Sequence, residues 1–153
     1  MSVHPLDILD NLFRKTPKNI HCVGSGFRQN NAEFAIINCQ IENDLSNKDI
    51  FVNIELSWLN PIKNRKMIII GSEKTMIVEC VQQKIQIMNN QSGVIESLNI
   101  HPNNTIRDEL EYFLNLSYGK TKENFNAPHG KIAKKIIKTI EQTNKSLNNN
   151  CST

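Results

Sequence analysis

The sequence predicts an α+β fold in which an open, mostly antiparallel β-sheet carries helices packed on one face. Three observations predict it: an amphipathic segment comes first, a run of short alternating segments follows, and two more amphipathic segments close the chain. The connections between the alternating segments are short and contain Gly, Asn, Asp or Ser, which is typical of antiparallel hairpins. The other face of such a sheet stays open, and a wide apolar open face invites a partner.

Two apolar segments joined through Pro61 lie at the centre of the chain. Residues 50–59 alternate, and the side chains expected on their inner face are Ile50, Val52, Ile54, Leu56 and Trp58. Residues 66–70 are short and branched, which is typical of a buried strand. Because Pro61 has no N–H to donate to a ladder, we expect a hairpin-like central pair that bends there. A basic corner follows the proline, formed by Lys63, Arg65 and Lys66.

Four further strands are expected at residues 19–23, 33–41, 76–81 and 84–88. Residues 89–104 are polar and are expected to form a loop. Gly24-Ser25-Gly26 follows the first of these strands, and we interpret it as a hairpin turn.

Three helices are expected, over residues 4–15, 105–116 and 131–147. The apolar stripe of the first is Leu6, Leu9, Leu12 and Phe13. The stripe of the second is Ile106, Leu110, Phe113 and Leu114, and that of the third is Ile132, Ala133, Ile136, Ile137 and Ile140. We expect one domain over residues 1–147 and a disordered tail over residues 148–153.

Length and composition are those of a single domain that does not bind nucleic acid or cross a membrane. A chain of 153 residues is long enough to form one domain whose core needs no disulfides or metals. The net charge of +3 gives no argument for nucleic acid, and no apolar run approaches the ~20 residues that cross a bilayer. The four cysteines form no Cys-x-x-Cys pair and no secretory signal is apparent, so we expect a reducing, cytoplasmic compartment. The histidines and cysteines share no ligand spacing, so we expect no metal site.

Three stretches together carry a family resemblance. They are His4-Pro5-Leu6-Asp7-Ile8-Leu9, then Ser57-Trp58-Leu59-Asn60-Pro61 through Lys63 and Arg65 to Gly71-Ser72, then residues 107–114 with Asn126 and the last helix. In this order they resemble the C-terminal domain of the Gfo/Idh/MocA oxidoreductases, the family of glucose–fructose oxidoreductase and inositol dehydrogenase. The first is similar to the family's His-x-x-Asp helix opening, the second to its branch acting on nucleotide-activated sugars, and the third to its closing helices.

The resemblance implies that the sheet builds the substrate side of an active site and that its outer face forms a subunit interface. It also implies a Rossmann domain ahead of this one, with a Gly-rich phosphate loop and a catalytic lysine that this chain lacks. No helix follows Gly24-Ser25-Gly26 to offer its N-terminus to a pyrophosphate. We therefore expect no cofactor site here, and NAD(P) as the cofactor of the complete family enzyme. A carboxylate of the family's pattern would fall just ahead of Met1.

His4 is the candidate catalytic residue. Oxidation of an alcohol needs a base for the hydroxyl proton while hydride leaves to the nicotinamide, and imidazole suits that transfer. The alternative is a surface histidine at a frayed N-terminus, and in the isolated chain we expect His4 to be idle. Asp7 would orient His4 or a substrate hydroxyl, or else it is a solvated helix acid.

Three more residues are candidates for substrate binding. Lys63 and Arg65 would neutralise a sugar-nucleotide phosphate, or else they form a solvated basic corner. Asn126 would face the substrate or cap the last helix. Trp58 is expected in the core or an interface rather than as a platform for stacking a sugar.

The leading hypothesis is a C-terminal substrate-binding and oligomerisation domain of an NAD(P)-dependent sugar or nucleotide-sugar oxidoreductase, truncated or split and inactive alone. One alternative is a stand-alone homodimeric binding or scaffolding module, and another is half of a split enzyme completed by a separate Rossmann-domain chain. The expected partners are a second copy at the open sheet face and a sugar-type small molecule, with no nucleic acid and no membrane. A Gly-x-Gly-x-x-Gly frame upstream of Met1 would favour a split or truncated enzyme.

Overall fold

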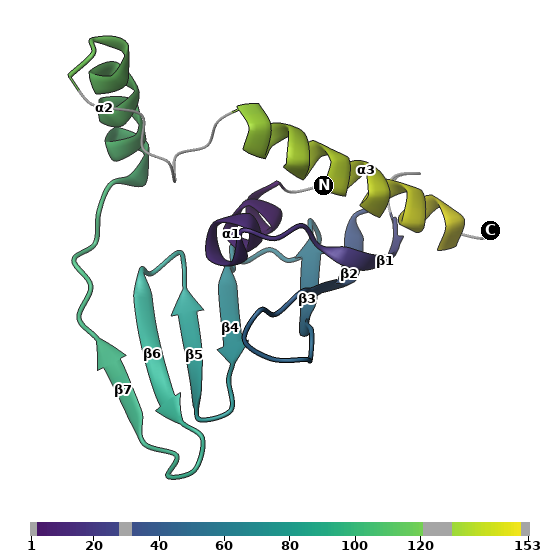
Figure 1. Cartoon of the computed structure of the whole chain (residues 1–153), viewed down its shortest axis with the longest axis horizontal. Helices are drawn as coiled ribbons and strands as arrows, with labels where there is room; N and C mark the ends of the chain where they lie inside the picture. Colours follow the sequence, from purple (N-terminus) through teal and green to yellow (C-terminus); the bar gives the residue numbers. More distant parts are fainter. Residues whose placement is uncertain (1–2, 28–31, 121–129, 151–153) are drawn as a thin grey trace. The chain divides into compact units, whose positions relative to one another are not determined.

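The computed structural model describes residues 3–27, 32–120 and 130–150, and these form two compact units (Figure 1). The first unit combines Met1–Asn60 with Asn124–Thr153, and the second is Pro61–Glu123. Each unit has its own antiparallel sheet, so the α+β class predicted from the sequence is confirmed. No helix in the described ranges is both long and apolar enough to cross a membrane.

The first unit is a three-stranded sheet with two helices on one face. Its elements are α1 (His4–Phe13), β1 (Lys18–Ser25), β2 (Phe34–Ile41), β3 (Ile50–Ser57) and α3 (Gly130–Asn150), and the strand order is β1-β2-β3. Side chains of β2 alternate, and those on the inner face are buried. The core cluster is Leu6, Leu9, Cys22, Ala35, Ile37, Ile41, Ile54 and Ile136. Because both helices and all three strands contribute to this cluster, both helices cover the same face of the sheet.

Helix α1 begins as the sequence predicts, with Pro5 in its first turn. It ends at Phe13, two residues before the expected end, because Arg14 adopts a left-handed conformation with φ of 54°. Leu6 and Leu9 are buried, but Leu12 is 49% exposed. The buried position on the next turn belongs instead to Asp10, which the sequence analysis did not single out.

Helix α3 packs closely on β1, and its buried stripe is more polar than expected. Ile132, Ile136 and Ile140 face the core as predicted, whereas Ala133 and Ile137 are exposed. The stripe continues through Thr139 and Thr143, whose hydroxyls donate to the backbone carbonyls of Lys135 and Thr139 at 3.1 and 2.8 Å. Threonine fits this buried face because the helix itself satisfies its hydroxyl. The helix also runs to Asn150, past the expected end at residue 147.

The interpretation of Gly24-Ser25-Gly26 as a hairpin turn is wrong for its first two residues, and Gly26 begins the connection from β1 to the antiparallel β2. Gly24 and Ser25 are the last residues of β1, paired with Ala35 and Phe34 of β2. A Cβ atom on Gly24 would lie 2.5 Å from the carbonyl oxygen of Phe34 and 3.0 Å from Cδ1 of Leu147. Glycine is therefore required here by the close approach of β2 and α3.

The second unit is a four-stranded antiparallel sheet followed by one helix. Its elements are β4 (Lys66–Ile70), β5 (Lys74–Glu79), β6 (Lys84–Asn89), β7 (Ile95–Leu98) and α2 (Thr105–Ser117), and the strand order is β4-β5-β6-β7. Strand β7 lies within the segment that was expected to be a loop. The turn before it is built on Asn89, whose side-chain oxygen accepts from the N–H groups of Gln91 and Ser92, and on Gly93 with φ of 69°.

The expected central hairpin is not formed. β3 and β4 belong to different sheets, so the strands make two sheets rather than the single sheet predicted. The physical reason lies in the connection: residues 58–65 are irregular, and Pro61 has no N–H with which to continue a ladder from β3 into β4.

Replacing Gly24 by alanine is expected to lower the free energy of unfolding by about 1–3 kcal/mol, because the added methyl group overlaps backbone that cannot move cheaply. The measurement is urea unfolding followed by circular dichroism. Gly130→Ala is the matched control, since a Cβ atom at Gly130, at the start of α3, meets nothing within 4 Å. Equal unfolding midpoints for Gly24→Ala and the wild-type protein would show that the close approach is not a constraint.

Candidate functional site

His4 is the first residue of α1, and its side chain is exposed. Asp7 lies one helical turn further on, half-buried, and its backbone N–H donates to the carbonyl oxygen of Val3 at 3.1 Å. Residues three apart on a helix share one edge, with Cβ atoms about 5–6 Å apart. The two side chains can therefore address one ligand together, although no hydrogen bond joins them within the described residues.

The position of this helix edge is fixed by a buried ion pair. The Lys135 ammonium group of α3 donates to the Asp10 carboxylate of α1, and the Asp10 side chain is only 9% exposed. Asp10 lies two turns after the start of α1, so the pair fixes that part of the helix against α3. Leu6 and Leu9 place the same face of α1 in the core. The end of α1 that carries His4 is thereby held on the first unit.

A second hydrogen bond ties α3 to the sheet. The backbone N–H of Cys22 in β1 donates to the Ser146 hydroxyl oxygen at 2.9 Å. Since β1 is an edge strand, this N–H points away from β2, and α3 supplies the acceptor that a further strand would otherwise provide. Cys22 itself is fully buried. Cys39, on β2, is also buried, and this burial raises the pKa of its thiol. Both cysteines therefore behave as small core residues.

Lys63 and Arg65 lie in the second unit, in the irregular segment ahead of β4, and both are exposed. Neither side chain has a hydrogen bond or ion pair with another described residue, whereas Lys66, the third cation of the corner, pairs with Glu79 at 3.3 Å. These two cations are thus available to a ligand. The structure brings His4 and Asp7 together in one unit and Lys63 and Arg65 together in the other.

The remaining candidates have mixed outcomes. Asn126 and the neighbouring His129 lie outside the described residues. Trp58 follows the end of β3 and is 84% exposed, so it does not lie in the core, and its expected place in an interface stays a prediction. Its backbone N–H donates to the carbonyl oxygen of Glu33 at 2.8 Å, which holds the residue at the end of the sheet with its side chain outward.

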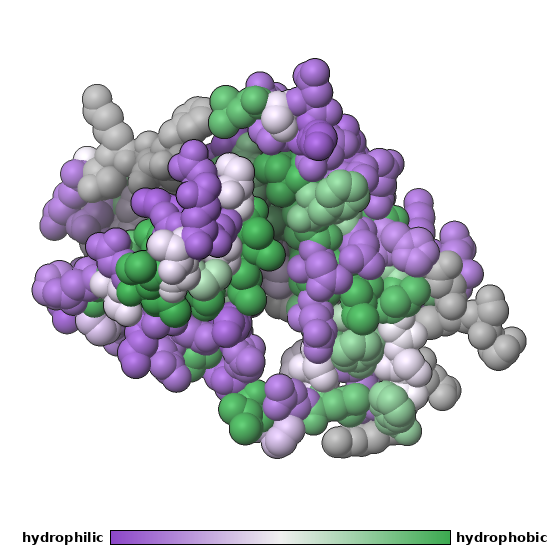
Figure 2. All heavy atoms as spheres, turned by 90° about the horizontal axis from the view of Figure 1, so that it is seen from below, coloured by the Kyte–Doolittle hydropathy of each residue, from purple (hydrophilic) through white to green (hydrophobic). Residues whose placement is uncertain are grey.

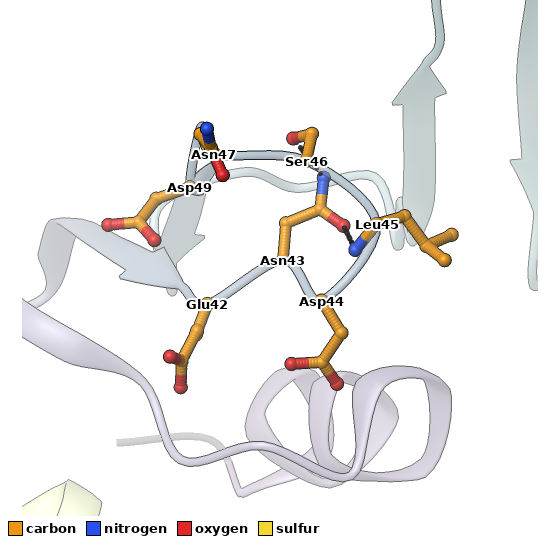
Figure 3. Close-up of a pocket in the computed structure, with 7 residues that line it drawn as sticks. All are labelled: Glu42, Asn43, Asp44, Leu45, Ser46, Asn47 and Asp49. Atoms are coloured by element: carbon orange, nitrogen blue, oxygen red, sulfur yellow. Dashed lines mark hydrogen bonds between the residues drawn. The ribbon is translucent and has the colours of Figure 1, made fainter.

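A hollow in the β2–β3 loop is built from the loop's own polar groups (Figure 3). Its lining residues are Glu42, Asn43, Asp44, Leu45, Ser46, Asn47 and Asp49. The Asn43 side chain accepts from the N–H of Leu45 at 3.0 Å and donates to the Ser46 hydroxyl at 2.8 Å. These bonds explain the hollow as a consequence of a tightly turned loop.

The carboxylates of this loop are matched by lysines. Lys15 donates to Asp44 at 2.7 Å, and this hydrogen bond to the carboxylate raises the pKa of Lys15. Lys18 lies 3.1 Å from Asp49. In the described ranges no three His, Cys, Asp or Glu side chains are grouped to hold a metal ion. The loop therefore fastens the segment between α1 and β1 rather than offering a ligand site.

Sequence reasoning missed the residues that position the helix, Asp10 and Lys135. A signal was available: Asp10 stands four residues after Leu6, on the stripe that the leucines define, where an apolar residue is the usual choice. A carboxylate at a core position requires a cation as its partner. The sequence does not identify Lys135 as that cation.

Comparison with known proteins identifies the fold. No family model and no curated protein matches the sequence. Among solved structures, UDP-N-acetylglucosamine 3-dehydrogenase GnnA from Acidithiobacillus ferrooxidans matches over 98% of this chain and 46% of its own, with a TM-score of 0.82 and 17% identity. An NAD-binding protein from Listeria innocua matches over 97% of this chain and 44% of its own, with a TM-score of 0.70 and 19% identity.

A biliverdin reductase from Synechocystis, solved with biliverdin and NADP+, matches over 95% of this chain and 45% of its own, with a TM-score of 0.66 and 10% identity. The structural neighbours include oxidoreductases of the Gfo/Idh/MocA type, so the fold implied by the resemblance is confirmed. The chain spans a little under half the length of each neighbour. Its fold is therefore the fold of the segments that it matches in these neighbours.

Replacing Lys135 by methionine is expected to lower the free energy of unfolding by about 1–3 kcal/mol, because it leaves the Asp10 carboxylate buried without its cation. The value is below that of a fully buried pair since the Lys135 side chain is 29% exposed. Adding Asp10→Asn to Lys135→Met is expected to recover part of the loss. Urea unfolding of both variants measures it.

Glu111→Gln provides the control, because the Arg107–Glu111 pair on α2 is exposed and is worth at most about 0.5 kcal/mol. If Lys135→Met were as stable as the wild-type protein, or if Asp10→Asn deepened its loss, the pair would not be what holds α1.

Proposed function

We propose that this chain is the substrate-binding and oligomerising half of an NAD(P)-dependent oxidoreductase that acts on a sugar or nucleotide sugar, and that it does not catalyse alone. The observation that carries the proposal is the match of nearly the whole chain to less than half of a UDP-N-acetylglucosamine 3-dehydrogenase, at a TM-score of 0.82. The resemblance in sequence to the nucleotide-sugar branch of the same kind of oxidoreductase supports it independently.

In this proposal His4 takes the hydroxyl proton of the substrate while hydride leaves to the nicotinamide. Bound NAD(P), held by the other half of the enzyme, supplies the hydride acceptor. The exposure of His4 at the start of α1 leaves its ring accessible to a substrate, and the first helical turn places Asp7 on the same edge. Asp7 then orients the imidazole or accepts a hydrogen bond from a second sugar hydroxyl.

Lys63 and Arg65 bind the diphosphate of a nucleotide sugar. Their support is that both are exposed and that neither is neutralised by a described carboxylate, unlike Lys66. A guanidinium group binds phosphate oxygens in pairs, and an ammonium group adds a compact second charge. Asn126, ahead of α3, is assigned to the sugar itself.

The second candidate function, a homodimeric binding or scaffolding module without catalysis, is favoured by one observation. Ile68, Ile70 and Ile95 of the β4–β7 sheet are 53, 79 and 59% exposed, which is unusual for strand isoleucines. In either function a second copy binds at this open sheet face. We also assign the chain to the cytoplasm, since Cys22, Cys39 and Cys80 are free thiols, as in a reducing compartment.

The purified chain is expected to bind UDP-N-acetylglucosamine and not NAD or NADP in a calorimetric titration. Lys63→Ala with Arg65→Ala is expected to weaken binding roughly tenfold or more, because each charge-assisted bond to phosphate is worth about 1.5–3 kcal/mol. The affinity for N-acetylglucosamine, which lacks the nucleotide, should be unchanged by the two substitutions.

Lys74→Ala is the control, since it removes a cation from the same unit outside the basic corner. Two results would contradict the proposal: turnover of NAD(P) by the chain with a nucleotide sugar, or an affinity for UDP-N-acetylglucosamine that Lys63→Ala and Arg65→Ala leave unchanged.

A further inference from the structure

Two large aromatic side chains are exposed at one end of the β1–β2–β3 sheet. Phe27 comes shortly after the end of β1 and is 74% exposed, and Trp58 comes directly after the end of β3 and is 84% exposed. Because β1 and β3 both run antiparallel to β2, both of these strands end where β2 begins. The two aromatic residues therefore flank the start of the same central strand.

One residue, Glu33, holds the backbone at both aromatic positions. It directly precedes β2, and its carbonyl oxygen accepts from the N–H of Trp58 at 2.8 Å. Its side-chain carboxylate accepts from the N–H of Phe27, also at 2.8 Å. The N–H of Glu33 donates to the carbonyl oxygen of Ser25, the last residue of β1, at 2.9 Å. Three groups of one residue thus fix the points from which the two aromatic side chains extend.

The joint anchoring of Phe27 and Trp58 distinguishes them from other exposed apolar residues. Figure 2 shows hydrophobic residues reaching the surface between hydrophilic ones, so exposure alone does not mark a site on this protein. Here two aromatic residues are held at the same end of one sheet. A ligand that binds them does not have to order the backbone first, and that lowers the entropic cost of binding.

The spacing of the two positions suits one flat ring. Ser25 and Ser57, the last residues of β1 and β3, pair with the same residue of β2, so they are two inter-strand spacings apart, about 10 Å. Stacked aromatic rings have centroids roughly 4.5–7 Å apart, so two rings on either side of a third are about 9–14 Å apart. A planar ring therefore fits between side chains that start from these two strand ends.

Trp58 also offers a polar group beside its aromatic surface. Its indole N–H donates to no other residue that the structure describes, although this group usually finds a partner. A ligand that satisfies it carries an acceptor, such as a carbonyl oxygen, at the edge of its ring. Nucleobases combine a planar ring with such acceptors, whereas a pyranose ring is puckered and carries hydroxyl groups around it.

We propose that Phe27 and Trp58 bind the nucleobase of the nucleotide sugar, with the base stacked against their rings. The inference rests on the function proposed above and specifies which residues of the first unit recognise the nucleotide. It gives Trp58 the role of a stacking platform, and it adds Phe27, which the sequence pattern did not single out. Glu33 is then a positioning residue, because it acts by holding the backbone of both aromatic residues.

The fluorescence of Trp58 tests this site directly, since Trp58 is the only tryptophan in the chain. Uridine, which carries the base without a phosphate, is expected to quench this fluorescence in a saturable way. N-acetylglucosamine at the same concentration is expected to leave it unchanged. Phe27→Ala is expected to weaken uridine binding about fivefold or more, because it removes one of the two stacking surfaces.

Phe51→Ala is the matched control. Phe51 is also an exposed aromatic residue of this sheet, 79% exposed, but it lies near the start of β3, toward the other end of the strand. Its removal is expected to leave the uridine affinity unchanged. In a calorimetric titration Trp58→Phe is expected to keep most of the binding that Trp58→Leu loses, since phenylalanine retains a stacking surface. Circular dichroism should be the same for all four variants.

Quenching that rises linearly with uridine, as it does for free tryptophan in solution, would overturn the site, as would equal affinities in Phe27→Ala and Phe51→Ala. Saturable quenching by N-acetylglucosamine would overturn the assignment to a base. Any of these results leaves the proposed function intact if binding of UDP-N-acetylglucosamine still depends on Lys63 and Arg65. Saturable binding of uridine at Trp58 without that dependence would instead contradict the proposed diphosphate site and support the aromatic one.

Discussion

The ion pair between Asp10 and Lys135 joins the two ends of the chain, 125 residues apart in sequence, and the arrangement of the first unit depends on it. Helix α1 has two buried leucines, and Phe13 adds a partly buried contact with the core. A carboxylate buried between helices must keep its cation close, so the pair limits where α1 can lie against α3. Its contribution is therefore to select one placement of α1, and with it one placement of His4, rather than to add much net stability.

That placement in turn depends on how closely α3 approaches β1. Cys22 and Gly24 of β1 are small residues, which lets α3 come close to the strand. Thr143 of α3 is fully buried. The Cys22 N–H bonded to Ser146 closes the free edge of the sheet at the same place. Small residues therefore let α3 and β1 pack closely without large apolar side chains. The threonine hydroxyls can be buried there because they are hydrogen-bonded within the helix.

The sequence predicted most elements because their patterns are local. The alternation in β2 and β3, and the stripes of α1 and α2, follow directly from which residues are apolar. The failures have non-local causes. The local pattern predicts a turn at Gly24 because glycine is common in turns, whereas glycine is required there by Phe34 and Leu147, which lie close in space. Strand β7 has only four residues, with an apolar residue at each end and two polar residues between them, so its pairing with β6 is what defines it.

The candidate site was predicted in part for the same reason. The spacing of His4 and Asp7 guaranteed a shared helix edge once the helix was certain. The pairing of Lys66 with Glu79, which leaves Lys63 and Arg65 exposed, depends on strand register and cannot be predicted from residue spacing. The division into two units is not predicted either, because a proline between two strands is equally compatible with a bend within one sheet.

We propose that this chain forms the substrate side of a two-part oxidoreductase. The most direct test is a chimera in which it replaces the matched segment of the Acidithiobacillus GnnA chain, assayed for formation of reduced nicotinamide with UDP-N-acetylglucosamine. We expect turnover that requires both halves and that is lost in the His4→Asn variant. Turnover by this chain alone, or a chimera whose rate is unchanged by His4→Asn, would contradict it.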